Sequence, residues 1–127
     1  MSISTNFFDN FANRIKSDIR TFVPAFVVSY DKAHNTADVQ PSYLMTSDSK
    51  TSYEIPMLQD VPILSFNLRK KGTDTKEVYL QDFNNGDIVL LAICDRDIDE
   101  LGEKRFYPDS SRMFNPVDAV IVGGYNL

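Results

Sequence analysis

The sequence has little of several residue types on which protein chemistry often depends. Its 127 residues include one cysteine, one histidine and no tryptophan. A lone Cys94 allows no internal disulfide, and its place within an apolar run is typical of a buried, unreactive thiol. Because His34 and Cys94 are the only soft ligands, a zinc site would lack the side chains that the metal requires. We therefore expect no metal, no other cofactor and a fold that is stable without disulfides.

Long apolar runs are also missing. None approaches the roughly 20 residues of a membrane helix, and the N-terminus MSISTNFFDNF lacks the basic start and apolar core of a signal peptide. We expect the chain to be made in the cytoplasm and to remain soluble. Its net charge of -5 disfavours contact with phosphate backbones and anionic lipids. Nucleic acid and membranes are therefore not expected as partners.

The N-terminal part carries apolar residues at helical spacing. Phe7, Phe11 and Ile15 recur every four residues, which predicts an amphipathic helix over residues 4–20. We treat residues 1–23 as a helical segment and residues 24–127 as one domain. The apolar stripe needs a surface to cover, either its own domain or a neighbouring subunit, and the sequence leaves both open. Phe7, Phe11 and Ile15 are thus a candidate assembly interface.

From Pro24 onward the apolar period changes to two, which is typical of β-strands. Pro41 predicts an edge position or a bulge in the second strand, and the run from Ile88 to Cys94 predicts a central strand covered on both faces. The protein is expected to be mainly β, as a small closed or half-closed barrel of about five strands with an N-terminal helix. The expected strands comprise residues 25–30, 37–45, two pieces within 53–66, 77–80, 88–94 and 117–124.

Four acids follow the apolar run directly: Asp95, Asp97, Asp99 and Glu100. The three aspartates match the first ligand positions of a calcium loop, but Phe106 stands where the essential bidentate glutamate belongs. We favour a strand end at which the acids enter a short helical turn and basic neighbours neutralise them. The neighbours of suitable spacing are Arg96, Lys104, Arg105 and Arg112.

The remaining candidates for chemistry are isolated. His34 lies in a polar turn without the partners of a nucleophilic triad. The basic cluster Arg69–Lys71 is interpreted as a solvated loop that prevents edge pairing, with contact to an acidic partner as the alternative. No glycine-rich phosphate loop is present. We therefore expect a protein that is not an enzyme.

Five segments occur in an informative order: VPAFVVSYD, TADVQPSY, IPMLQDVPI, NNGDIVLLAICDRDID and FNPVDAVIVGGY. From about Phe7 to Gly124, this order and spacing resemble the N-terminal OB-fold domain of phage central spike proteins. These trimeric proteins of the tail tip or baseplate hub puncture the host envelope. The resemblance implies a structural role for the family positions Val39, Gln40, Pro41, Val61, Pro62, Gly86, Asp87, Arg96, Asp97, Asp99, Asp118, Gly123 and Gly124.

The resemblance also implies a function. The chain would be a homotrimeric virion structural protein that caps the baseplate hub, closes the tail tube and contacts the host envelope during infection. Its partners would be hub and tail tube proteins. Spike proteins of this group continue into a needle, and this sequence ends at Leu127, so a needle supplied by another chain and a reduced plug both stay open.

Two alternatives belong to other functional classes. An OB-fold module for single-stranded nucleic acid would need a basic groove with aromatic stacking platforms, which the acidic composition disfavours. A small hydrolase using the acids from Asp95 to Glu100 would need one carboxylate of raised pKa beside one that stays ionised. No pattern in the sequence predicts that pair.

Overall fold

The computed structural model describes residues 3–46, 52–108 and 111–126. The chain forms two compact units, Met1–Thr21 with Ile93–Asp118, and Phe22–Ala92 with Ala119–Leu127. No helix in the described residues is long and apolar enough to cross a membrane. The elements are α1 (Ile3–Asp18), β1 (Phe22–Asp31), β2 (Thr36–Pro41), β3 (Leu44–Thr46), β4 (Ser52–Glu54), β5 (Leu58–Pro62), β6 (Phe66–Arg69), β7 (Lys76–Tyr79), β8 (Ile88–Ile93), the 3-10 helix η1 (Pro116–Asp118) and β9 (Ala119–Gly124).

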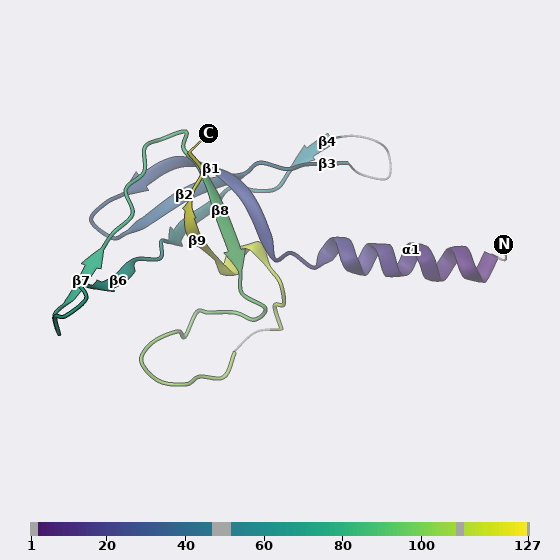
Figure 1. Ribbon diagram of the computed structural model, residues 1–127. Helices are drawn as coiled ribbons and strands as arrows, with labels where there is room; N and C mark the ends of the chain where they lie inside the picture. The colour runs from purple at the N-terminus through teal and green to yellow at the C-terminus, as the bar shows by residue number, and fades with distance from the viewer. Residues whose placement is uncertain (1–2, 47–51, 109–110, 127) are drawn as a thin grey trace. The chain divides into compact units, whose positions relative to one another are not determined.

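Five strands form one curled sheet in the order β5-β2-β1-β8-β9 (Figure 1). Strand β1 pairs antiparallel with both β2 and β8, and β2 pairs antiparallel with β5. The two outer strands meet where Ile63, directly after β5, forms a parallel bridge with Ile121 of β9. The Leu64 amide donates to the Ile121 carbonyl at 3.0 Å. The sheet thus closes on itself, as predicted, with the strand arrangement of a small OB-fold-like barrel.

The segment that closes the barrel is also held to the β1–β2 turn. The Ile63 amide donates to the Asn35 carbonyl at 3.2 Å, and the Asn35 side-chain amide donates to the Ile63 carbonyl at 2.9 Å. Asn35 has a φ of 55°, in the left-handed region that asparagine tolerates better than most residues. The turn residue therefore positions β5 against the barrel as well as reversing the chain.

Two expectations about individual strands were wrong. Strand β2 lies between β5 and β1, so Pro41 is not on an edge strand; it is the last residue of β2, paired with Ala25. The irregularities of register lie elsewhere, between Val27 and Ser29 and between Ala37 and Val39. The central strand is β1, whereas β8 lies beside it. A proline at a strand terminus forfeits little of the ladder, which explains why it is accepted there.

The core lies on the inner face of this sheet. Strands β2 and β8 alternate between buried and half-buried positions, so β8 is fully covered on one face and partly covered on the other. Val39, Val89, Leu91 and Ile121 are each 0% exposed. The other buried apolar residues are Val23, Ala25, Val27, Ala37, Ile55, Leu58, Val61, Ile63, Phe83, Ile93 and Ala119. β-Branched side chains dominate because they pack well on a pleated surface.

The N-terminal helix agrees with the prediction to within two residues at its C-terminal end. Phe7, Phe8 and Phe11 are 62%, 64% and 55% exposed, and Ile15 is 46% exposed. The rings of Phe7 and Phe11 stack with centroids 6.2 Å apart. The helix α1 thus carries a continuous apolar stripe that is accessible in the single chain.

Two further hairpins are separate from the barrel sheet. Strands β3 and β4 pair with each other, as do β6 and β7. The predicted single strand over residues 37–45 is therefore two elements, β2 and the start of the β3–β4 hairpin. The segment of residues 67–76, expected to be a loop, provides most of β6 and the beginning of β7.

Replacing Leu91 with alanine should reduce the free energy of unfolding by about 2 to 5 kcal/mol, because it removes methyl groups from a fully buried position and leaves a cavity. Leu101→Ala is the matched control, since Leu101 is 65% exposed, and should change stability by about 0.5 kcal/mol or less. Urea unfolding followed by circular dichroism measures both. Equal losses in the two variants would contradict the assigned core.

Candidate functional site

The connection between β8 and β9 contains a network of charged contacts around Arg112 and Asp118. Its two ends are tied together, because the Cys94 amide donates to the Asp118 carbonyl at 3.0 Å. Farther along, the Phe114 amide donates to the Asp95 carbonyl at 3.1 Å, and Arg96 forms an antiparallel bridge with Met113. The two ends of the loop therefore run side by side before the chain opens into the residues between them.

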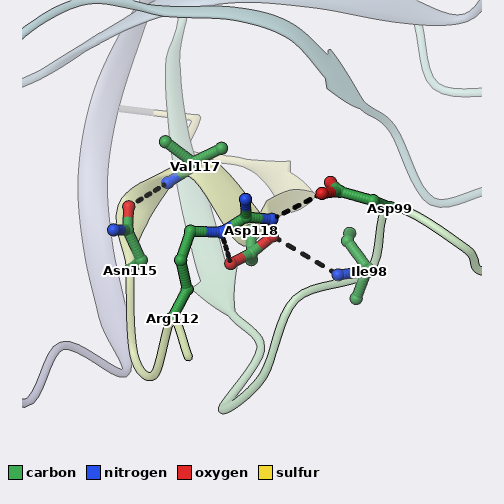
Figure 2. A network of polar contacts seen from close by, with 6 residues as sticks. All are labelled: Ile98, Asp99, Arg112, Asn115, Val117 and Asp118. Carbon is green, nitrogen blue, oxygen red and sulfur yellow. Dashed lines mark hydrogen bonds and ion pairs between the residues drawn. The ribbon is translucent and has the colours of Figure 1, made fainter. Parts of the chain in front are cut away.

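At the centre of the network is Asp118, whose side chain is 1% exposed (Figure 2). The Arg112 guanidinium donates from Nε to Oδ2 at 3.1 Å and from Nη2 to Oδ1 at 2.9 Å. The Ile98 amide donates to Oδ1 at 3.3 Å. Both carboxylate oxygens therefore have donors, as a buried charge requires.

Arg112 connects this buried acid to an exposed one. Its Nη2 also donates to Oδ2 of Asp99 at 3.0 Å, so one guanidinium pairs with two carboxylates (Figure 2). The pKa of Arg112 is raised above its ordinary value, mainly by its hydrogen bonds to Asp118 and secondly by its hydrogen bond to Asp99. The contacts to Asp118 have the two-point geometry that makes arginine a good partner for a buried carboxylate.

A local turn places Asp118 for this role. The Asp118 amide donates to the Asn115 carbonyl at 2.9 Å, and the Val117 amide donates to Oδ1 of Asn115 at 3.0 Å. These bonds form the short helix η1, which ends at Asp118 and so places its side chain directly before β9. Phe114 has a φ of 51°, an uncommon backbone conformation for a bulky residue that its bond to Asp95 helps to hold.

The cluster of acids predicted from the sequence is thus divided among different environments. Asp95 and Glu100 are exposed, Asp97 is 1% exposed, and Asp99 is paired with Arg112. Of the basic residues expected to neutralise these acids, Arg112 is confirmed in that role. The expected helical turn is a hydrogen-bonded turn instead, in which the Leu101 amide donates to the Ile98 carbonyl at 3.1 Å. Within the described residues, no group of histidine, cysteine and acidic side chains is placed to hold a metal.

Sequence reasoning missed the role of Asp118 as the centre of the network. It was singled out as a position matching the family but received no contact partner. The available signal was its place in PVDAV, where a charge directly precedes a strand that is apolar enough to be buried. Such a position requires a counter-charge, and Arg112 is the nearest basic residue before it.

Cys94 lies at the base of the same loop and is half-buried. Burial raises the pKa of its thiol, and the negative charges of Asp118 and Asp95 raise it further. The side chain is therefore held as a thiol at neutral pH, in agreement with its interpretation as unreactive. The neighbouring acids Asp118 and Asp95 disfavour the thiolate that a nucleophile needs.

The other residues singled out from the sequence belong to other elements. Phe7, Phe11 and Ile15 are on α1, Val39, Gln40 and Pro41 on β2, Val61 and Pro62 on β5, and Gly123 and Gly124 at the end of β9. Gln40 donates from its side-chain amide to the Ile55 carbonyl at 2.6 Å. At Gly124 an added Cβ would lie 3.0 Å from a ring carbon of Phe83, so the glycine permits close packing.

Gly86 and Asp87 form the turn before β8. Gly86 has a φ of 95°, which suits glycine, and its amide donates to the Val27 carbonyl at 2.7 Å. The Val27 amide in turn donates to the Asp87 carbonyl at 2.9 Å. The predicted turn at Asn85-Gly86 is therefore present and continues the pairing of β1 with β8.

The single histidine belongs to the β1–β2 turn, as expected. Its Nδ1 lies 2.7 Å from Oδ2 of Asp31, and 78% of the His34 side chain is exposed. The hydrogen bond from the His34 side chain, followed by the one from its backbone amide, holds the pKa of Asp31 below its ordinary value. A third hydrogen bond, from the Ala33 amide, also lowers the pKa of Asp31. The contact between Asp31 and His34 therefore belongs to the structure of the turn.

Replacing Arg112 with leucine should reduce the free energy of unfolding by about 2 to 4 kcal/mol, because it leaves the Asp118 carboxylate buried without its counter-charge. Asp99→Asn is the matched control and should cost about 1 kcal/mol or less, since that ion pair is largely exposed. Chemical denaturation of the variants measures both effects. Similar values for the two variants would show that the buried pair does not stabilise the loop.

Comparison with known proteins supplies the family. A search of the curated proteins found no match. The family model described as phage protein Gp138 N-terminal domain matches residues 23–124, which include every strand of the barrel except the first residue of β1. The match confirms the resemblance to a phage spike N-terminal domain. The chain belongs to the family of the phage protein Gp138 N-terminal domain, which indicates a structural component of a phage particle.

Proposed function

We propose that this chain is a non-enzymatic, homotrimeric protein of the phage tail tip that caps the central hub of the baseplate and closes the tail tube. In this role it contacts the host envelope during infection and takes part in its penetration. The observation that carries the proposal is the family match over nearly all of the barrel.

The α1 helix supports the assembly part of the proposal. Phe7, Phe11 and Ile15 are exposed at 62%, 55% and 46% on one stripe of the helix. Exposed apolar surface of this kind typically marks an interaction site in a soluble protein. Three copies can bury such a stripe against each other, or a neighbouring hub protein can cover it.

The loop network supports the structural part of the proposal. Arg112 neutralises the buried Asp118 carboxylate. The two ends of the β8–β9 connection are joined by the bonds from Ile98 and Cys94 to Asp118 and from Arg112 to Asp99. This arrangement fixes a loop, and both oxygens of the carboxylate are occupied by donors within the chain. Such a network suits a structural protein, because it holds a long loop in one conformation.

Replacing Phe11 with aspartate should shift the protein from trimers toward monomers, because it places a charge in the middle of the apolar stripe. The control is Asn13→Asp, which adds the same charge to an exposed position on the opposite side of α1. Light scattering on a sizing column measures the mass, with a trimer at three times 14.4 kDa, about 43 kDa.

A wild-type protein that stays monomeric at high concentration would contradict self-assembly. A trimer that survives Phe11→Asp would instead remove α1 from the interface. Immunogold labelling of phage particles tests the location separately, because label along the tail or on the capsid would exclude the tail tip. The three measurements therefore address assembly, interface and position one at a time.

A further inference from the structure

The β6–β7 hairpin and its turn, residues 66–79, form an arm that extends from the barrel (Figure 1). All eight strand residues of the arm are exposed. An isolated two-stranded hairpin is marginally stable in water and normally packs against another surface. The β6–β7 hairpin, as an exposed two-stranded element, would therefore gain stability by packing against a partner.

The base and the turn of the arm are well defined. The Gln81 side-chain amide donates to the Leu64 carbonyl at 2.8 Å and to the Val122 carbonyl at 2.9 Å. The Tyr30 hydroxyl donates to the Gln81 carbonyl at 2.9 Å. At the turn, Thr73 donates to the Lys70 carbonyl from both its amide and its hydroxyl. The segments that flank the arm are thus bonded to the barrel, and its turn is held by local hydrogen bonds.

The register gives the arm two different faces. Phe66 pairs with Tyr79 and Leu68 with Glu77, whereas Asn67 pairs with Val78 and Arg69 with Lys76. Because paired residues share a face and neighbours alternate, the first face is largely apolar and the second largely polar and basic. Phe66, Leu68 and Tyr79 are 50%, 52% and 53% exposed. An apolar face of this kind on an anchored arm is typical of an interaction surface.

The charge of the arm indicates its partner. Residues 66–79 contain four basic and two acidic residues, a net charge of +2, so the remainder of the chain carries -7. A second copy therefore carries a net charge opposite to that of the arm, and Asp31, Asp60 and Asp82 are each exposed on its barrel unit. An anionic membrane would attract the arm but repel the rest of the molecule.

We propose that the arm docks through Phe66, Leu68 and Tyr79 onto a second copy of this chain. This inference rests on the proposed homotrimer and assigns to it a contact surface distinct from the α1 stripe. The apolar face supplies the buried area, and the basic residues at the tip select the acidic neighbour. The docked neighbour also provides the packing that a lone hairpin lacks.

The chain offers a closely matched pair of variants for the test. Leu68 and Val78 are apolar strand residues with exposed fractions of 52% and 53%, but they lie on opposite faces of the arm. Leu68→Asp should raise the concentration at which the trimer dissociates by about ten-fold or more, as loss of a central apolar contact does. Val78→Asp lowers the charge of the arm equally but spares the apolar face, so it should raise that concentration much less. Light scattering over a dilution series measures both, and circular dichroism confirms that each variant is folded.

The outcomes separate this inference from the proposed function. A trimer weakened by Leu68→Asp and not by Val78→Asp supports the docking face. If the wild-type protein is a trimer and Leu68→Asp does not weaken it, or weakens it no more than Val78→Asp does, the docking proposal is wrong. The proposed trimer is unaffected by that result. A wild-type monomer overturns both. Co-sedimentation with vesicles of phosphatidylglycerol and phosphatidylcholine completes the test. Vesicle binding that Leu68→Asp abolishes would assign the apolar face to lipid and overturn docking onto a second copy.

Discussion

Closure of the barrel depends on a short parallel contact between the segment after β5 and strand β9. The Ile63–Ile121 bridge and the bond from Leu64 to Ile121 join two strands that are far apart in the sequence. Without this contact the five-stranded sheet would expose two edges, and edges invite pairing with other chains. The buried side chains of Val39, Leu91 and Ile121 all require the curled sheet to remain closed. The core and the anchored base of the arm therefore depend on the same contact.

The charged network after β8 solves a different physical problem. A strand that leaves a core and a strand that enters it must be connected, and here the connection is long. The buried pair of Asp118 and Arg112 is weak evidence for high stability, because desolvation of two charges offsets much of their attraction. The pair instead restricts the geometry of the loop, because Arg112 held by Asp118 also bonds Asp99 at the other end of the connection. The four acids that resemble a catalytic or metal-binding cluster in the sequence all belong to this connection.

Much of the fold could be predicted from the sequence, for reasons that particular residues make clear. Alternating apolar residues identified β1, β2 and β9, and the stripe of Phe7, Phe11 and Ile15 identified α1, because these patterns reflect local geometry. The β6–β7 hairpin was expected to be mostly loop, since its strand residues are exposed and lack a buried alternation. The pairing of Arg112 with Asp118 is a matter of tertiary structure. The sequence indicated that basic side chains must neutralise the acids after β8, but it could not show which carboxylate would be buried.

The bond between the Cys94 amide and the Asp118 carbonyl has a consequence for how this protein can vary. It fixes the distance between the ends of the β8–β9 connection independently of the chain between them. Loop-closure entropy grows only with the logarithm of length, so doubling such a connection costs about 0.6 kcal/mol. We therefore expect insertions or deletions within residues 101–108, outside the network around Asp118, to leave the register of the barrel unchanged. The connection is a site where new surface can evolve at little thermodynamic cost.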